Sequence, residues 1–173
     1  MERFSAVAPL HSVQPPYNLF EREAEAAVLP YGQRHHLTVL AYGALCRGLL
    51  SGRMLAGTRF TGDDLRRTDP KFQQPRFGQY LAAVDTLERF ANENYGRGVL
   101  ALAVRWILDR GETVALWGAR RPDQLDPMAE VSNWSLDATA QQEIELILRH
   151  YIKDPVGPQF MAAPEKPQTR AAA

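Results

Sequence analysis

The chain has 173 residues, the length of one ordinary domain, and 45% of them are hydrophobic, which is enough to build a buried core. Its 20 basic and 20 acidic residues cancel, so the overall charge argues against nucleic acid or a membrane surface as a partner. A net charge of zero also favours self-association. The single cysteine, Cys46, cannot form an internal disulfide, which fits a reducing cytosol.

The N-terminus and the most apolar run of the chain carry no targeting or membrane signal. Residues 1–10 lack a basic stretch followed by an apolar run, so we expect no signal peptide. Residues 99–108 are the most apolar, but Arg105 interrupts them and the run is too short to span a bilayer. The sequence therefore predicts a soluble, cytoplasmic protein.

Three short segments rich in β-branched and apolar residues are predicted to be strands. They cover residues 11–14, 37–42 and 113–117. Pro15 ends the first strand because proline cannot donate a hydrogen bond to a sheet, and Gly43 bounds the second. Glycines punctuate the long stretch from Gly43 to Pro75, and such a loop in a compact domain is usually either functional or disordered.

Apolar residues at helical spacing predict helices between and after these strands. The predicted helices cover residues 21–36, 77–91, 99–110, a short segment from residue 122, and 138–151. Pro30 and Gly32 are expected to end or kink the first of them, and Asp137 is expected to cap the last. Residues 1–4 have the pattern of a helix end.

The alternation of strands and helices predicts an α/β fold in which right-handed crossovers join parallel strands. We expect one domain over residues 1–153. From Asp154 onward proline, alanine and glutamine dominate, so residues 154–173 are predicted to form a disordered tail.

Four stretches together form a distinctive pattern. They are residues 14–22 (QPPYNLFER), 42–53 (YGALCRGLLSGR), 63–67 (DDLRR) and 118–125 (GARRPDQL). In this order and at these spacings they resemble the aldo-keto reductases, nearest the branch that includes potassium-channel beta subunits. The resemblance covers residues 4–151, nearly the whole predicted domain.

The resemblance implies that the chain is the C-terminal part of a (β/α)8 TIM barrel, with its three strands as the sixth, seventh and eighth. A complete barrel takes roughly 250 residues. Met1 would then fall inside the fifth barrel helix, which fits a misplaced start codon, a split gene or a true truncation. The family's catalytic Asp, Tyr, Lys and His lie on earlier strands, so no catalytic residue is carried over.

By family, the implied activity is that of an NADP(H)-dependent oxidoreductase that reduces a small aldehyde or ketone. This chain would carry most of the cofactor site, and we expect no reductase activity from it alone. The alternative is a non-catalytic fragment that acts as a nucleotide-binding or interaction module, or as half of a two-chain barrel. Three strands of a barrel leave two parallel edges unpaired, which self-association or a separate N-terminal half would cover.

Two residues at strand ends are expected to contact the nicotinamide. Gln14 ends the first strand, and the matching family residue holds the carboxamide, a role that suits an amide side chain. Tyr42 ends the second strand, where an aromatic residue of the family stacks under the nicotinamide ring. From the residues alone, Gln14 also fits a surface position before a turn, and Tyr42 also fits an ordinary core tyrosine.

The stretch after the second strand is expected to wrap the pyrophosphate. Family positions that contact it match Gly43, Leu45, Arg47 and Arg53. Glycines let backbone N–H groups approach phosphate oxygens, and arginine pairs with phosphate as a charged donor. Arg66 fits the same role, although loop lengths vary at its position. The alternative for Arg53 and Arg66 is a solvated basic surface.

The turn after the third strand is expected to hold the 2′-phosphate of the adenosine. Gly118, Arg120 and Gln124 match family positions there. Arg120 together with Arg121 favours NADP over NAD, because two cations complement the extra phosphate charge. The family often has Glu-Asn shortly afterwards, at the adenine, whereas this chain has Pro-Met at residues 127–128, which puts adenine recognition in doubt.

Metal and thiol chemistry are not expected. His35 and His36 fit the C-terminus of a helix, where the dipole favours a cation, better than they fit a metal site. Cys46 has neither a cluster of metal ligands nor a base placed by any motif.

Overall fold

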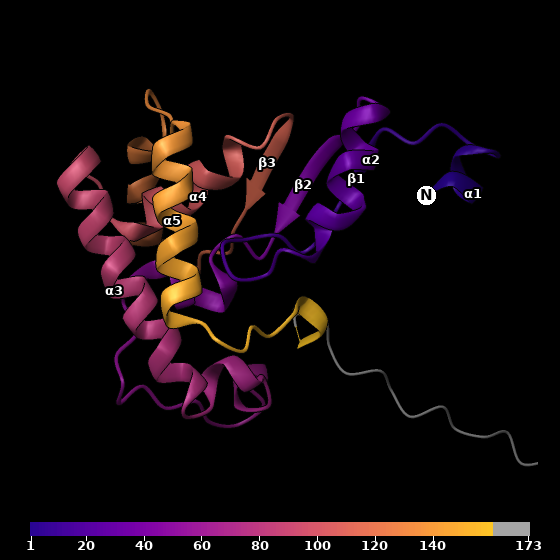
Figure 1. Cartoon of the computed structure of the whole chain (residues 1–173). Coiled ribbons are helices and arrows are strands. Elements are labelled where there is room, and N and C mark those ends of the chain that lie inside the picture. The colour runs from indigo at the N-terminus through magenta and orange to yellow at the C-terminus, as the bar shows by residue number, and fades with distance from the viewer. Residues whose placement is uncertain (161–173) are drawn as a thin grey trace, which may run out of the picture.

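The computed structural model describes residues 1–160 and has a parallel three-stranded sheet at its centre (Figure 1). The strands are β1 (Ser12–Val13), β2 (Thr38–Tyr42) and β3 (Thr113–Leu116), in that order across the sheet. Val13 lies opposite Val39, and Tyr42 lies opposite Leu116. The three predicted strands and their parallel pairing are confirmed. Because the strands are parallel, the loops that follow them all begin at the edge of the sheet formed by the carboxyl ends of the strands.

Helices connect and cover the strands. The α-helices are α1 (Glu2–Ser5), α2 (Val28–Arg34), α3 (Arg76–Tyr95), α4 (Val99–Leu108) and α5 (Ala138–Tyr151). Figure 1 shows α3 and α5 side by side beyond β3, whereas α2 lies beside β1 and β2. None of the helices within residues 1–160 has the length and hydropathy that crossing a membrane requires.

The helix predicted over residues 21–36 is broken, but not where the sequence indicated. A 3-10 turn, η1 (Glu23–Ala26), precedes α2, and the break lies at Ala27, whose φ is −144°. Pro30 stands in the first turn of α2, where a missing N–H costs nothing. Gly32 is buried inside α2, and a Cβ there would lie 3.3 Å from Val39 Cγ2. The glycine therefore lets the helix pack closely on β2 rather than ending it.

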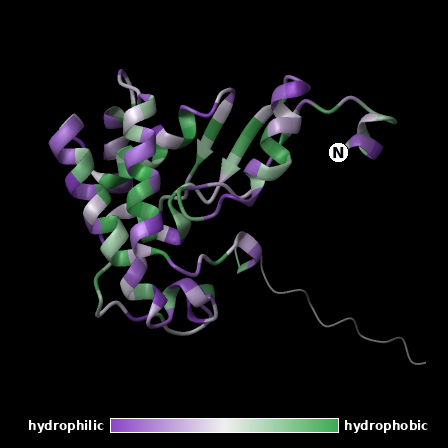
Figure 2. Ribbon diagram, in the orientation of Figure 1, coloured by the Kyte–Doolittle hydropathy of each residue, from purple (hydrophilic) through white to green (hydrophobic). Residues whose placement is uncertain are grey.

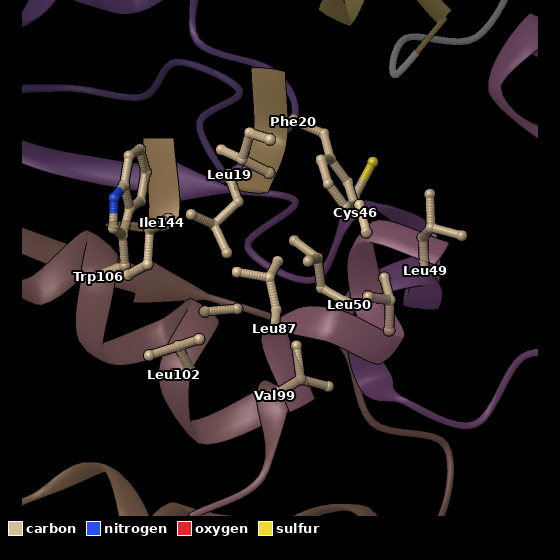
Figure 3. Close-up of a cluster of buried hydrophobic side chains, with 14 of the residues drawn as sticks. Leu19, Phe20, Cys46, Leu49, Leu50, Leu87, Val99, Leu102, Trp106 and Ile144 are labelled. Atoms are coloured by element: carbon tan, nitrogen blue, oxygen red, sulfur yellow. The ribbon is translucent and has the colours of Figure 1, made fainter. Parts of the chain in front are cut away.

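The hydrophobic core lies between the sheet and the helices α3, α4 and α5 (Figure 3). Leu87, Leu102 and Ile144 each come from a different helix and are fully buried in it. Trp106 is also fully buried, and its ring centroid lies 5.2 Å from that of Tyr17. In Figure 2 the strands are largely hydrophobic, whereas α3 and α5 are banded with hydrophilic residues. The apolar faces of these helices thus pack into the shared core, as their amphipathic patterns require.

The long stretch after β2 is folded rather than structureless. It contains the 3-10 turns η2 (Cys46–Ser51), η3 (Leu65–Arg67) and η4 (Pro70–Phe72). The carboxylate of Asp64 accepts a 3.0 Å hydrogen bond from the backbone amide of Arg66, and Asp69 accepts one of 3.0 Å from that of Lys71. Each aspartate therefore caps the turn that follows it.

The C-terminal segment packs against the core for part of its length. A last 3-10 turn, η7, spans Pro158–Phe160. Val156 is buried, and its backbone amide donates a 3.2 Å hydrogen bond to Tyr80 Oη. Within the tail predicted to be disordered, residues 154–160 therefore include a packed residue, and the remainder lies outside the described residues.

Candidate functional site

A cavity of about 580 Å³ opens where β2 and β3 end. Seven of the ten predicted cofactor contacts line it: Gly43, Leu45, Arg47, Arg66, Gly118, Arg120 and Gln124. These residues come from three stretches that are far apart in the chain and that the fold brings to one edge of the sheet. Trp117, on the segment that leaves β3, forms part of the same wall.

The loop of residues 43–48 forms one wall and has an unusual backbone. Positive φ angles occur at Gly43 (70°), Cys46 (45°), Arg47 (53°) and Gly48 (89°). Two of these residues carry side chains, and for them the left-handed region is uncommon and tends to mark functional sites. Within residues 1–160 the backbone amides of Leu45 and Arg47 donate to no oxygen. Amides left free on such a concave loop form a site for an anion.

The Arg47 side chain turns into the protein. Both terminal nitrogens of its guanidinium are buried and have no hydrogen-bond partner among the described residues. The closest carboxylate oxygen, Asp69 Oδ2, is 4.0 Å from Arg47 Nη1. Arg47 thus lines the cavity with a backbone amide that has no acceptor within residues 1–160, while its positive charge lies toward Asp69.

Arg66 is held in place beside this loop. Its Nε donates to Asp64 Oδ1 at 2.9 Å, and its Nη1 donates to the carbonyl oxygen of Arg47 at 3.3 Å. Its guanidinium also lies 4.4 Å from the ring centroid of Phe60. The hydrogen bond from Arg66 is the main reason why the pKa of Asp64 is lowered to about 2. At neutral pH the pair is therefore fully ionised, and its hydrogen bonds hold the Arg66 guanidinium in one orientation before any ligand binds.

The turn after β3 forms the opposite wall. Gln124 Oε1 accepts hydrogen bonds from the backbone amides of Arg120 (2.6 Å) and Arg121 (3.2 Å). Arg121 is paired with Asp123 at 3.0 Å, whereas the exposed Arg120 side chain has no partner within residues 1–160. The short helix predicted from residue 122 is a three-residue 3-10 turn, η5 (Pro122–Gln124), followed by a second, η6 (Asp126–Val131).

Arg53 lies next to this cavity rather than in it. It lines a neighbouring cavity of about 330 Å³ that shares Arg66, Gly118 and Gln124 with the first. Its guanidinium is exposed, and Nη1 lies 3.7 Å from Asp123 Oδ2. This ion pair links the loop after β2 to the turn after β3.

Gln14 and Tyr42 lie at the same edge of the sheet but line neither cavity. Gln14 follows β1 and is exposed. Tyr42 ends β2, and its backbone amide donates to Pro15 O at 3.1 Å, while its carbonyl oxygen accepts from Tyr17 N at 3.2 Å. The ends of β1 and β2 are thus adjacent, and Tyr42 lies opposite Pro16, two residues beyond Gln14.

A buried ionic cluster behind the loop was not predicted from the sequence. Lys71 Nζ lies 2.7 Å from Glu21 Oε1 and 3.1 Å from Asp69 Oδ2, and all three side chains are fully buried. Asn18 Nδ2 donates both to Glu21 Oε2 at 2.7 Å and to Gly43 O at 3.0 Å. Burial acts to lower the pKa of Lys71, but the carboxylates of Glu21 and Asp69 act to raise it and prevail. The ammonium is therefore charged.

A model of the aldo/keto reductase family matches residues 1–149. The chain belongs to this family. It is 56% identical over 167 residues to the aldo-keto reductase YhdN of Bacillus subtilis, an alignment that covers 96% of this chain and 50% of that protein.

Solved structures of aldo-keto reductases agree with the fold. A glycerol dehydrogenase from Gluconobacter oxydans superimposes with a TM-score of 0.86 at 51% identity, over 94% of this chain and 49% of its own. An aldo-keto reductase from Klebsiella pneumoniae, in complex with NADPH, has a TM-score of 0.51 at 22% identity, over 86% and 40%. The chain thus spans about half the length of the relatives that it matches.

The donors around the cavity fit the phosphates of the nicotinamide cofactors that serve this family. The free amides of Leu45 and Arg47 and the unpaired side chain of Arg120 are donors that lack an acceptor within residues 1–160. A phosphate carries only acceptors, so it satisfies such a set.

Thiol and metal chemistry have no support in the described residues of this aldo-keto reductase chain. Burial, followed by the charge of Glu21, raises the pKa of the Cys46 thiol well above its ordinary value, so the thiol stays protonated. His35 stacks on Tyr31 with ring centroids 4.2 Å apart at the end of α2. Residues 1–160 contain no cluster of three or more His, Cys, Asp or Glu that could hold a metal ion.

Proposed function

We propose that this chain holds NADP(H) in the cavity between residues 43–48 and the turn at residues 118–124, as the cofactor-binding part of an aldo-keto reductase. The observation that carries the proposal is the convergence of seven predicted contact residues on one cavity. They belong to three separate stretches of the chain, so their meeting is not a consequence of sequence proximity.

Each part of the cofactor has a partner in this proposal. The amides of Leu45 and Arg47 and the guanidinium of Arg66 hold the pyrophosphate. Arg120 holds the 2′-phosphate, which favours NADP over NAD. Gln14 and Tyr42 contact the nicotinamide from the strand ends. When bound, NADPH supplies the hydride that reduces a carbonyl carbon.

The adenine meets an apolar pair of residues in this proposal. Residues 127–128 lie in η6, where the sequence has Pro-Met instead of a polar pair. Met128 is 52% exposed and offers an apolar side chain. Adenine would therefore be bound by contact area rather than by hydrogen bonds at this position.

We further propose that the chain is the C-terminal part of a (β/α)8 barrel, its strands being the sixth to the eighth. Supporting this, β1 and β3 are both edges of the sheet within the described residues, and Val114 of β3 is 43% exposed. In a closed barrel such edges pair with further strands and such a residue faces the packed interior. The likeness to the branch with potassium-channel beta subunits stays a prediction, as does a cytoplasmic location.

For the chain by itself we propose binding without chemistry. The residues that line the cavity include no Tyr, Lys or His that could donate a proton to the forming alkoxide. Reduction of a small aldehyde or ketone is proposed for the full-length enzyme. A nucleotide-binding module, or one half of a two-chain barrel, is then what the 173 residues provide.

The test is a titration of the 173-residue chain with NADPH, followed by cofactor fluorescence. We expect saturable binding that Arg66→Ala weakens by about tenfold, because a charged hydrogen bond to phosphate is worth roughly 1.5–3 kcal/mol. Arg89→Ala is the matched control, since Arg89 is 62% exposed on α3 and pairs with Asp85 away from the cavity. Equal affinity in all three proteins, or no binding to the wild type, would contradict the proposal.

The same preparations test the absence of chemistry. We expect no NADPH oxidation when small aldehydes or ketones are added to the purified chain. NADPH oxidation by the wild-type chain that disappears in Arg66→Ala would show instead that the chain is a reductase by itself.

A further inference from the structure

Lys71 stands at the centre of the buried ionic cluster, between two carboxylates that belong to different parts of the chain. Glu21 follows the loop after β1, and Asp69 precedes η4. Lys71 Nζ is 2.7 Å from the former and 3.1 Å from the latter, and it also donates to Gly157 O at 3.5 Å. The three charged side chains are all fully buried.

From Lys71, one chain of contacts reaches the start of the cofactor loop. Glu21 accepts from Asn18 Nδ2 at 2.7 Å, and the same nitrogen donates to Gly43 O at 3.0 Å. Gly43 has a φ of 70° and is the first residue with a positive φ in the loop. The carboxylate of Glu21 therefore orients the side-chain amide of Asn18, and this amide holds the loop at Gly43 through its hydrogen bond to the carbonyl oxygen.

A second chain of contacts reaches the far end of the same loop. Asp69 Oδ2, which Lys71 contacts, is 4.0 Å from Nη1 of Arg47. The carbonyl oxygen of Arg47 accepts from Arg66 Nη1 at 3.3 Å. Asp69 thus lies between the cations of Lys71 and Arg47. Its charge attracts Arg47, which belongs to the loop and whose carbonyl oxygen holds Arg66 beside it.

We propose that Lys71 is a positioning residue for the cofactor: its buried contacts with Glu21 and Asp69 hold residues 43–47 in the conformation that presents two free amides to the pyrophosphate. This inference rests on the proposed function. Lys71 does not line the cavity, so it acts through Asn18 at one end of the loop and Arg47 at the other.

The loop conformation needs such support because it is costly. Cys46 and Arg47 both have positive φ angles, which non-glycine residues adopt at a cost and keep where the surroundings fix them. Without the ammonium, two carboxylates would be left buried beside one guanidinium. The two buried carboxylates would then attract the guanidinium of Arg47. As that side chain moved toward them, the backbone amide of Arg47 would leave its present position.

The test compares two ligands that differ in whether they reach the loop. NADPH carries the pyrophosphate, whereas adenosine 2′-monophosphate carries only the phosphate assigned to Arg120. The full chain is titrated with each ligand, by fluorescence and by calorimetry respectively, in the wild type, Lys71→Met and Asp69→Asn. Lys153→Met is the control, because Lys153 is exposed and donates to Arg149 O on α5.

For Lys71→Met we expect NADPH to bind about tenfold more weakly while the affinity for adenosine 2′-monophosphate is unchanged. Asp69→Asn, which keeps the Lys71 contact with Glu21, is expected to weaken NADPH selectively and by less. Lys71→Arg, which keeps the charge, is expected to recover part of the affinity. A purely structural role would scale both ligands together through the folded fraction, so the ratio of the two affinities decides.

An unchanged ratio in folded Lys71→Met would overturn the inference. Should Lys71→Met fail to fold, Asp69→Asn carries the decision in the same way, because it retains one of the two buried pairs. If the wild type binds adenosine 2′-monophosphate and NADPH but neither variant changes the ratio, the positioning role fails and the proposed function stands. If the wild type binds neither ligand, both fail.

Discussion

The carbonyl oxygen of Gly43 accepts a 3.0 Å hydrogen bond from the side-chain amide of Asn18, a residue that precedes it by 25 positions. Asn18 Oδ1 also accepts from the backbone amides of Phe20 (2.9 Å) and Glu21 (3.1 Å). Both polar atoms of this fully buried side chain are therefore hydrogen-bonded, and it acts as a junction between loops. It joins the loop after β1 to the loop after β2 at the edge of the sheet where the cavity opens.

Removing this junction should destabilise the fold and the cofactor loop together. Asn18→Ala leaves the backbone amide of Phe20 and the Oε2 atom of Glu21 buried without the partner that Asn18 supplies, and each loss costs roughly 1–3 kcal/mol. The Gly43 carbonyl and the Glu21 amide each lose one hydrogen bond but keep a backbone partner. We expect the free energy of unfolding in urea to fall by about 3 kcal/mol. Gln142→Ala, which removes an exposed amide from α5, should change it by less than about 0.5 kcal/mol. Similar losses in both variants would mean that Asn18 makes no net contribution.

The ion pair at the cavity rim should be visible in a pH titration. The hydrogen bond from Arg66 lowers the pKa of Asp64 to about 2, below the value of about 3.9 for an unfolded chain. The pairing therefore stabilises the fold above about pH 4 and is lost as the pH falls through 2.

Carbon NMR of the aspartate carboxyl groups measures this shift directly. In Arg66→Ala the pKa of Asp64 should return to about 3.9. A pKa that is the same in the variant and in the wild type would show that Arg66 is not its cause.

The cap of α5 should contribute separately from the site. Asp137 Oδ1 accepts a 2.8 Å hydrogen bond from the backbone amide of Ala140, which satisfies an amide of the first helical turn. Asp137→Ala is expected to lower the free energy of unfolding by about 1 kcal/mol. Thr139→Ala, an exposed substitution in the same turn, should raise it slightly or leave it unchanged. NADPH affinity should be the same in both variants, since α5 is not part of the cavity wall.

The shared core of α3, α4 and α5 should respond to truncation as one packed unit. Leu87 is fully buried, so Leu87→Ala is expected to cost roughly 2–5 kcal/mol through lost burial and the cavity left behind. Leu146 is 67% exposed on α5, and Leu146→Ala should cost less than about 0.5 kcal/mol. Thermal unfolding followed by circular dichroism distinguishes the two. A small effect at Leu87 would show that the helices do not pack on one another as described.

Much of the fold could be predicted from the sequence because its signals are local. The β-branched run before Gly43 marked β2, and Asp137 marked the start of α5. Pro30 and Gly32 misled because their effect depends on tertiary context. The proline fell in the first helical turn, where its missing N–H is harmless, and the glycine makes room for Val39 of β2.

The candidate site was predictable to the extent that it consists of turns with recognisable residues. The stretches 43–48 and 118–124 meet because parallel strands end at one edge. The buried pair of Lys71 and Glu21 was not predictable, since charged residues are expected at the surface and nothing local shows that two of them, 50 positions apart, meet. The inward turn of Arg47 toward Asp69 was missed for the same reason.

The most direct measurement of the proposed cofactor role compares NADPH with NADH, which differ by the 2′-phosphate alone. Both are titrated by fluorescence into the wild-type chain and into Arg120→Ala. We expect the wild type to bind NADPH at least about tenfold more tightly than NADH, and Arg120→Ala to remove most of that difference by weakening NADPH alone. Equal affinities of the wild type for both cofactors, or a preference for NADPH that survives in Arg120→Ala, would contradict the assignment of the turn at residues 118–124 to the 2′-phosphate.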